Sequence, residues 1–343
     1  MHDSATIRTP SGRASDQPPD PTDIVPLQTI CDGGVHCFSN SGARRSTLGD
    51  MESLPISHQI AHRLARAGLR GSQWYWRAVD RLQQPPPPGL VRLPDGMSLV
   101  HDPSDWTCRA AYQGTYEREI LRLLRDLLHP GETVIDVGAN VGIITTRAAG
   151  IVGPTGRVIA VEPSPRCIRE LIAVTNDMGN VTVVEAALGD ETGTVALAGW
   201  DNPDHRGLGS VVPGHRAGLA ENWHEGVALQ VPQMRLDDLL DEQVGDEGEI
   251  ALIKIDVEGY EPVVLRGAPN LFGSHRVRAA LLEVTTTLPV EWVGELLSAT
   301  VENYAAFAVE ESGLVRRRPT LTPVDADSAI ARSEQWNLLL RRR

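Results

Sequence analysis

Cysteine and long apolar runs are both scarce in this 343-residue chain. Its four cysteines are too few for the disulfide framework of a small secreted domain. No apolar run approaches the roughly 20 residues that cross a bilayer, and the N-terminal stretch MHDSATIRTPSGRASDQPPD lacks the apolar centre of a signal peptide. These absences exclude a disulfide scaffold and a transmembrane segment, and we expect a cytoplasmic protein.

Positive charge is also scarce. The 32 Lys and Arg residues are outnumbered by 45 Asp and Glu residues, which gives a formal net charge of -13. Because general nucleic-acid binding needs a basic face that neutralises phosphates, the composition predicts no nucleic-acid partner. Lysine itself occurs only at Lys254, and arginine supplies every other basic side chain. Lys254 is therefore of interest, although codon bias with one chance exception explains it equally well.

The remaining composition is that of a globular chain. With 41% apolar residues it is long enough for one large α/β domain with extensions, or for two average domains. Residues 1–52 are rich in Pro, Gly, Ser, Thr and Asp without periodicity, which predicts a disordered leader. Residues 53–111 predict an extension of one or two amphipathic helices, broken at Gly71, and then a hairpin. The principal domain is expected over residues 112–343.

The helical part of the extension has an apolar face and a basic face. The apolar side chains recur at near-helical spacing and are Ile56, Ile60, Leu64, Trp74, Val79 and Leu82. The other face carries the basic side chains His58, His62, Arg63, Arg66 and Arg70. We expect that second face to be solvated or to form a homodimer contact, in preference to a membrane contact.

The principal domain is organised around TVIDVGANVGIITT, residues 133–146. A β-branched run predicts a strand buried on both faces, and the spacing after Gly142 predicts the start of a helix. Gly138 and Gly142 bracket a tight turn between the two. Glycines at such places let a ligand or the helix approach the backbone closely, so a nucleotide-type ligand fits this site.

Strands and helices alternate through the rest of the domain. The further strands are predicted at 157–161, 181–186, 251–255, 279–284, 302–309 and 336–341, with shorter ones at 193–198 and 227–231. This alternation predicts an α/β fold with a parallel, doubly wound sheet. Ligands of such sheets bind at the carboxyl ends of the strands.

Acidic side chains stand at three of these strand ends. They are Asp136, Glu162, and Asp256 with Glu258. In a doubly wound sheet the three ends converge on one crevice. Glu162 lies 24 residues after Gly138, close to the spacing of about 20 at which an acid binds the ribose hydroxyls in this fold. The spacing indicates an adenosine ligand.

The turn from Gly138 to Gly142 distinguishes between adenosine ligands. A dinucleotide fingerprint reads G-x-G-x-x-G, but Asn140 occupies the position of its middle glycine. Asp136 would repel a pyrophosphate, whereas it suits an ammonium group and a sulfonium. The turn therefore favours S-adenosylmethionine over NAD, although Asp136 alternatively does no more than brace the loop.

An ordered set of motifs resembles a known family. The motifs are DVGANVG (136–142), VIAVEPSP (158–165), VEAALGD (184–190), LDDLL (236–240), IKIDVEGYEPVVLRGA (253–268), LLEV (281–284) and WNLLL (336–340). In this order they resemble the FkbM-type S-adenosylmethionine-dependent methyltransferases, over residues 112–341. The resemblance implies a Rossmann-like class I methyltransferase fold with a seven-stranded sheet, and methyl transfer to a hydroxyl oxygen of a small molecule or sugar.

The resemblance also implies where the cofactor binds. It places Gly138, Asn140 and Gly142 at the methionine end, Glu162 at the ribose, and Glu185, Ala186 and Ala187 at the adenine edge. Glu185 is alternatively a surface acid without such a role.

Removing the proton of an acceptor hydroxyl requires a base beside the methyl group. Asp256 is the first candidate, because it ends the strand opposite the methyl group in this architecture. Lys254 lies two residues earlier on the same strand face and could hold the deprotonated Asp256 or stabilise an alkoxide. Glu258 follows the strand, in a direction that the sequence does not define. His205, in a long loop, is the alternative base.

Other assignments remain open from the sequence. Asp256 and Glu258 could share a divalent metal, but no clear third ligand is present, so we assign none. Both acids could instead only shape the turn before the next helix. An NAD-dependent oxidoreductase and a non-catalytic nucleotide-binding module on the same fold are the rival functions. The expected partner is a small-molecule or glycan hydroxyl acceptor.

Overall fold

The structure is a computed structural model, and it describes most of the chain beyond residue 52. The described residues are 28–30, 36–39, 52–199, 209–211, 228–245, 248–285, 290–313 and 317–343. Most of the predicted leader and His205 lie outside these ranges.

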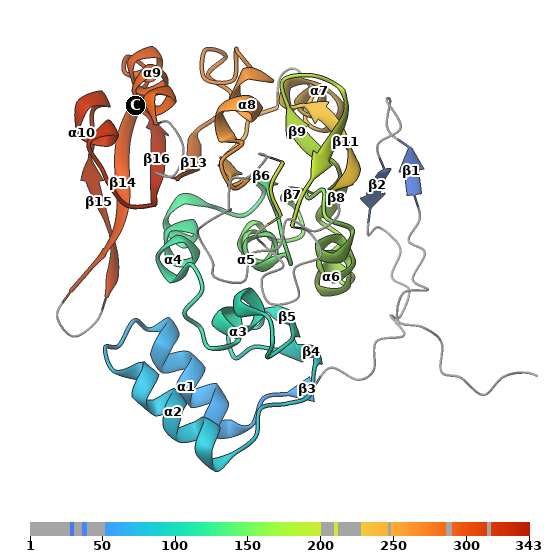
Figure 1. Ribbon diagram of the computed structural model, residues 1–343, viewed down its shortest axis with the longest axis vertical. Helices are drawn as coiled ribbons and strands as arrows, with labels where there is room; N and C mark the ends of the chain where they lie inside the picture. The colour runs from blue at the N-terminus through green and yellow to red at the C-terminus, as the bar shows by residue number, and fades with distance from the viewer. Residues whose placement is uncertain are drawn as a thin grey trace, which may run out of the picture.

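A mixed ten-stranded sheet forms the centre of the molecule (Figure 1). Its seven middle strands, in spatial order, are β8 (Val181–Glu185), β7 (Arg157–Val161), β6 (Thr133–Val137), β12 (Leu252–Ile255), β13 (Ala279–Val284), β16 (Trp336–Arg342) and β14 (Tyr304–Ser312). The strands from β8 to β13 are parallel, and β16 runs antiparallel between β13 and β14. The predicted α/β fold with a doubly wound, seven-stranded sheet is confirmed.

Three additional strands extend the two edges of this sheet. β1 (Gln28–Ile30) and β2 (His36–Ser39) form a hairpin beside β8, and β15 (Arg318–Pro323) pairs with β14. The sequence analysis predicted none of them. The two prolines of β15 obscured its pattern, and an edge strand tolerates proline because one of its sides forms no ladder. The hairpin lies within the predicted leader, where composition rather than alternation dominated the interpretation.

Helices cover both faces of the sheet (Figure 1). One face carries α4 (Arg118–Leu127), α5 (Ile143–Val152) and α6 (Pro165–Thr175), and the other carries α7 (Leu236–Gln243), α8 (Glu261–Arg266), α9 (Glu291–Thr300) and α10 (Ala326–Ile330). Alternation along each strand explains the two layers, since Val134 packs in the first core and Ile135 in the second. Both faces of the parallel strands are therefore apolar.

A small sheet lies beyond the carboxyl end of β8. It consists of β9 (Ala187–Gly189), β10 (Gly193–Leu197) and β11 (Leu229–Arg235), with β11 in the middle. β9 continues the chain directly from β8, so its residues stay close to the strand ends where ligands bind in this fold.

The N-terminal extension packs on the face that carries α5. Its elements are β3 (Glu52–Ser53), α1 (Ile56–Arg66), α2 (Ser72–Leu82), β4 (Gly89–Arg92), β5 (Ser98–His101) and α3 (Trp106–Tyr112). Its buried apolar residues belong to the same core as those of that sheet face. Asp95, in the β4–β5 turn, forms ion pairs with Arg147 of α5 and with Arg66 of α1, the latter at 3.3 Å. The extension and the sheet thus share a core and a partly buried ion-pair network.

The predicted faces of α1 and α2 are wrong for several side chains, although Val79 is buried and Arg63 and Arg70 are exposed as predicted. Ile56, Trp74 and Leu82, assigned to the packed side, are 75%, 65% and 87% exposed, whereas His58 and His62 are buried. The buried histidines have specific partners: His62 Nδ1–H donates to the Tyr112 carbonyl at 2.9 Å, and His58 packs against the Tyr112 ring. Hydrogen bonding and ring stacking make histidine acceptable in a core, which the apolar spacing alone could not indicate.

Gly138 gives the fold its most stringent steric requirement. Its φ of +78° lies in the left-handed region, and a Cβ there would meet the Asp256 carbonyl oxygen at 1.9 Å. We expect Gly138→Ala to destabilise the protein by about 2 to 5 kcal/mol, since strain and overpacking both contribute. Urea denaturation measures this change. Gly150→Ala is the matched control, because nothing lies within 4 Å of its added Cβ. The control should stabilise by at most about 1 kcal/mol, and equal effects of the two substitutions would contradict the steric argument.

Candidate active site

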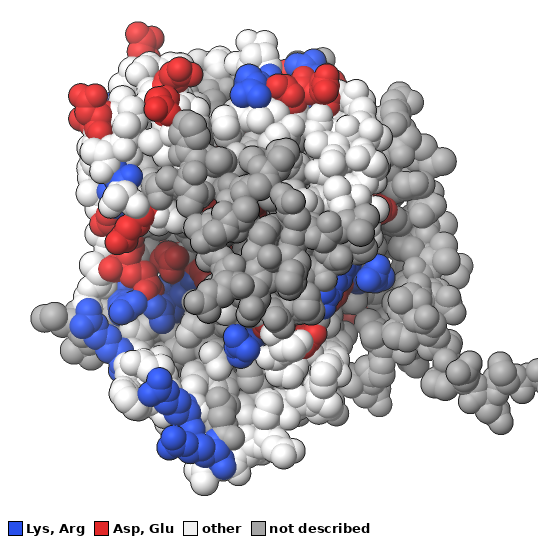
Figure 2. Space-filling model, viewed as in Figure 1, with Lys and Arg blue, Asp and Glu red and all other residues white. Residues whose placement is uncertain are grey.

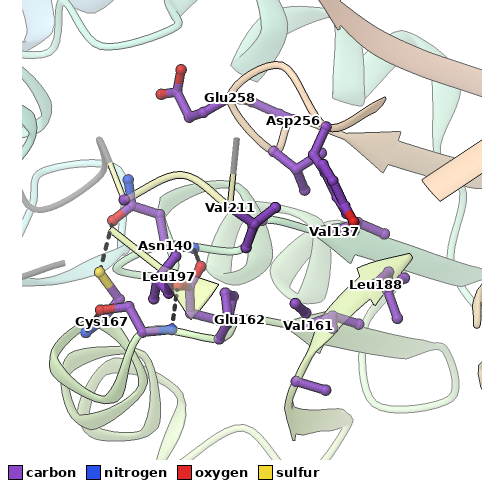
Figure 3. A pocket seen from close by; sticks show the side chains of 18 of the residues that line it. Val137, Asn140, Val161, Glu162, Cys167, Leu188, Leu197, Val211, Asp256 and Glu258 are labelled. Atoms are coloured by element: carbon purple, nitrogen blue, oxygen red, sulfur yellow. Dashed lines mark hydrogen bonds between the residues drawn. The ribbon is translucent and has the colours of Figure 1, made fainter. Parts of the chain in front are cut away.

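A cavity opens at the carboxyl ends of β6, β7 and β12, as the fold predicts (Figure 3). Including its open mouth, it encloses about 730 Å³. Its lining comes from the loops after these strands, from the β9 sheet and from the segment before α4: Tyr116, Val137, Gly138, Asn140, Val161, Glu162, Pro163, Ser164, Cys167, Ala186, Ala187, Leu188, Leu197, Gly209, Val211, Asp256, Val257, Glu258 and Tyr260. A cavity at the carboxyl ends of the strands is where ligands bind in this fold.

The turn after β6 is fixed by its backbone. The N–H groups of Gly138 and Ala139 both donate to the Val161 carbonyl at 3.0 Å, which ties the turn to β7. Asn140 has a φ of +51°, a left-handed conformation that asparagine tolerates better than most residues. The turn therefore keeps the close approach of a glycine-rich loop while exposing an amide side chain at its middle position.

Glu162 links this turn to the start of α6. Its Oε2 accepts from the Asn140 N–H at 2.8 Å, and its Oε1 accepts from the Ser164 N–H at 2.9 Å. Burial raises the pKa of Glu162 to about 7, although the two N–H donors oppose that rise. Each carboxylate oxygen retains a lone pair, so ribose hydroxyls could still donate to it.

Apolar side chains form the wall next to Glu162. Val161, Leu188, Leu197 and Val211 are labelled there in Figure 3, and Ala186 also lines the cavity. Such a wall suits the faces of an adenine ring, for which close apolar contact matters more than charge.

Asp256 and Glu258 lie on the side of the cavity opposite Asn140 and Cys167 (Figure 3). The Lys254 ammonium donates to Asp256 Oδ2 at 2.7 Å, and the Lys254 side chain is only 4% exposed. The predicted pairing of Lys254 with Asp256 is therefore present. Removing one partner of such a buried pair would leave an uncompensated charge.

Further carboxylates surround the Lys254 ammonium. Lys254 lies beside Asp136 in the parallel β6–β12 register, and Glu117 precedes α4 nearby. Burial opposes the charged ammonium, but Asp256, Glu117 and Asp136 outweigh it and raise the pKa of Lys254 above its ordinary value. Burial likewise raises the pKa of Glu117 to about 7, with Lys254 opposing. Lys254 is a cation held within a cluster of acids.

Glu283 lies close to Asp256 and Glu258. One carboxylate oxygen from each of Asp256, Glu258 and Glu283 lies within 4.8 Å of the others, close enough to share a cation. Glu283 is the second-last residue of β13 and supplies the third carboxylate that the sequence analysis did not find. Its position in LLEV, at the end of a predicted strand, was the available signal.

Two sequence features of the region have structural roles. Glu261 Oε1 accepts from the N–H groups of Val257 and Gly259 at 2.9 and 3.2 Å, so it closes the turn after β12. Asp136 Oδ2 accepts from the Thr145 hydroxyl at 2.6 Å, which braces the start of α5.

Some of the predicted cofactor residues line the cavity and others do not. Gly138, Asn140, Glu162 and Ala186 line the cavity. Asp136, Glu185 and Gly142 do not line it, and their cofactor roles stay predictions. A Cβ on Gly142 would meet Leu171 Cδ1 of α6 at 2.7 Å, so this glycine allows close helix packing.

The apolar spacing of TYEREILRLLRDLL predicts one helix over residues 115–128, and this prediction gives Tyr116 and Glu117 no role in the site. The chain instead adopts a left-handed conformation at Glu117, φ +35°, and α4 begins at Arg118. The break turns Tyr116 into the cavity and brings Glu117 near Lys254. No residue type in TYEREIL marks this break.

These residues fit S-adenosylmethionine. The turn at Gly138 allows close approach, Glu162 can accept from ribose hydroxyls, and the apolar wall suits adenine. The acids around Lys254 favour a cationic ligand and disfavour the pyrophosphate of NAD. None of the described helices is long and apolar enough to cross a membrane.

Comparison with known proteins agrees with this ligand. Residues 136–306 match the family model described as the methyltransferase FkbM domain. Fibrillarin-like rRNA/tRNA 2'-O-methyltransferases from Thermococcus onnurineus and Thermococcus gammatolerans are 37% and 35% identical over 65 residues. Each of these matches spans 19% of this chain and only 27% of the relative.

Solved structures of related architecture were also found. Methyltransferase FkbM from Methylobacillus flagellatus is 16% identical, over 69% of this chain and 55% of that one, with a TM-score of 0.36. Fibrillarin from Aeropyrum pernix, in complex with natively bound S-adenosylmethionine, is 15% identical over 73% and 92% of the two chains, with a TM-score of 0.30. On the family match, the chain belongs to the FkbM family of S-adenosylmethionine-dependent methyltransferases.

Proposed function

We propose that this enzyme methylates a hydroxyl oxygen of a small molecule or sugar. One observation carries the proposal: Asp256, paired with Lys254, lines the cavity on the side opposite Asn140 and Cys167. A carboxylate at that position can accept the proton of a hydroxyl acceptor bound between the two sides. When bound, S-adenosylmethionine supplies an electrophilic methyl group on a positively charged sulfur.

Asp256 acts as the base in this proposal. It accepts the acceptor's hydroxyl proton as the oxygen bonds to the methyl carbon, and the electron pair of the broken carbon–sulfur bond remains on sulfur. Lys254 is a positioning residue, because its ammonium fixes the Asp256 carboxylate from the buried side. Glu258 also lines the cavity and is the second candidate base. His205 remains a sequence-based alternative.

An RNA acceptor is the principal rival. The fibrillarin-like relatives carry names that specify rRNA and tRNA. The net charge of -13 opposes this reading, since RNA binding gains most of its affinity from neutralised phosphates. The rival functions that the sequence left open, an oxidoreductase and a non-catalytic module, both predict no methyl transfer.

Asp256→Asn tests the proposed base. We expect kcat for methyl transfer to fall about 10²- to 10⁴-fold, because the amide cannot accept the proton. Transfer of labelled methyl from S-adenosylmethionine to a panel of sugars, hydroxylated small molecules and RNA measures it, and isothermal titration calorimetry checks that cofactor affinity is unchanged. Glu258→Gln is the matched control and should retain most activity. Transfer to RNA alone, or full activity of Asp256→Asn, would contradict the proposal.

The role of Lys254 predicts non-additivity. Lys254→Met should lower kcat, and combining it with Asp256→Asn should cost no more than Asp256→Asn alone, because Lys254 acts through that carboxylate. Circular dichroism confirms that each variant folds. If the fold-reduction in kcat of the double variant instead equals the product of the two single fold-reductions, Lys254 acts independently of Asp256.

A pH prediction follows from Glu162. The free carboxyl has a pKa of about 7, and ribose hydroxyls together with the ligand's positive charge favour its ionised form. The affinity for S-adenosylmethionine should therefore be highest above pH 7 and should fall as the pH is lowered below 7. Calorimetry at several pH values measures this dependence. Glu162→Gln should bind about 10- to 100-fold more weakly at neutral pH and lose most of the pH dependence. The same pH dependence in both proteins would assign the titration to another group.

A further inference from the structure

The outer face of the α1–α2 hairpin carries large exposed apolar side chains. Eight large apolar residues are markedly exposed among the described residues, and five of them lie on this hairpin: Ile56, Ile60, Trp74, Tyr75 and Leu82. Their exposed fractions range from 36% for Tyr75 to 87% for Leu82. Isolated exposed apolar residues are ordinary, but a group on one helical hairpin indicates a binding surface.

The same hairpin is basic in an acidic protein. Residues 54–84 contain five arginines and one acid, a net charge of +4, while the whole chain has a net charge of -13. Arg63, Arg70, Arg77 and Arg81 are exposed. On the face seen in Figure 2, blue side chains gather over α1 and α2. The local charge therefore opposes the charge of the molecule.

Apolar and basic side chains alternate along each helix. On α1, Ile60 follows Ile56 by four residues and Arg63 follows Ile60 by three. On α2, the Arg77 guanidinium lies 4.6 Å from the centre of the Trp74 ring. Tyr75 and Leu82 line a shallow groove next to this pair. Arginines that flank tryptophan and aliphatic side chains are typical of helices lying in a membrane interface, where the long side chains reach the headgroups.

The charge distribution also favours a lipid surface over a second copy of the chain as the partner of this face. A twofold contact between two copies of this face would bring the arginines of both copies together, and like charges oppose such a contact. An anionic lipid surface supplies the complementary charge, and each arginine near it adds attraction. The hairpin lies at the end of the molecule opposite α8 and α9 (Figure 1). The β14–β15 turn contacts its inter-helix loop, where the Arg317 N–H donates to the Gly68 carbonyl at 2.8 Å.

We infer that the α1–α2 hairpin docks this enzyme on anionic phospholipid membranes, with Trp74 and Leu82 entering the interface and the arginines binding headgroup phosphates. The docking is peripheral and uses the surface of a folded unit. It is independent of the acceptor proposed above, because the surface lies on the N-terminal extension and shares no residue with the cavity.

Vesicle co-sedimentation of the full-length protein tests this inference. We expect at least about tenfold stronger binding to vesicles with about 30 mol% phosphatidylserine than to pure phosphatidylcholine, and loss of that difference in about 0.5 M salt. Trp74→Ser with Leu82→Ser should reduce binding at least about tenfold, and so should Arg63→Gln with Arg77→Gln and Arg81→Gln. All of these side chains are exposed, so the variants should fold, which circular dichroism and S-adenosylmethionine binding verify.

The matched control removes apolar surface elsewhere. Val301 and Ile330 are 56% and 40% exposed, so Val301→Ser with Ile330→Ser deletes comparable side chains far along the chain. This control should bind vesicles like the wild type. Equal binding to neutral and anionic vesicles, or no binding to either, would overturn the inference. So would a concentration-dependent dimer, seen by light scattering, that the Trp74 and Leu82 substitutions abolish.

Discussion

The pairing of Lys254 with Asp256 is the interaction on which the arrangement of the site depends. A nearly buried ammonium is costly unless carboxylates compensate it, and Asp256, Asp136 and Glu117 converge on it from β12, β6 and the segment before α4. Those acids would in turn repel one another without the cation. The ammonium therefore allows acids from three separate segments to gather at one end of the sheet, where they favour a positively charged ligand.

Two glycine-dependent contacts set the geometry around this charge cluster. The missing side chain of Gly138 lets the turn after β6 touch the Asp256 backbone, so the cofactor turn and the acceptor side of the site are in direct contact. Gly142 in the same way lets α5 and α6 pack closely. Glu162 then joins the turn to α6 through two backbone N–H groups. A displacement of the turn would thus change the positions of Asp256 and Glu162 together.

The N-terminal extension shows how burial can be reassigned by tertiary contacts. Its helices pack through alanines and histidines, because small side chains permit close approach, the Tyr112 carbonyl accepts from His62 and the Tyr112 ring contacts His58. The larger apolar residues are left on the outside, interleaved with arginine. The extension is attached to α5 through the Asp95 ion pairs, so whatever binds its outer face binds an element rigidly packed on the catalytic domain.

The sequence by itself determined the order of strands and helices, the acids at the strand ends and the type of ligand. Alternating apolar runs, glycine turns and the motif order are local signals, and local physics decides them. The tertiary structure alone decided which acids meet: Glu117 and Glu283 are 166 residues apart in the sequence, yet both lie near Lys254. It also decided that Gly142 packs against a helix and that Ile56 and Trp74 face outward. These outcomes depend on which surfaces pack against one another in the fold. Helical or strand periodicity shows where apolar side chains lie along an element, but it does not show which other residues they contact.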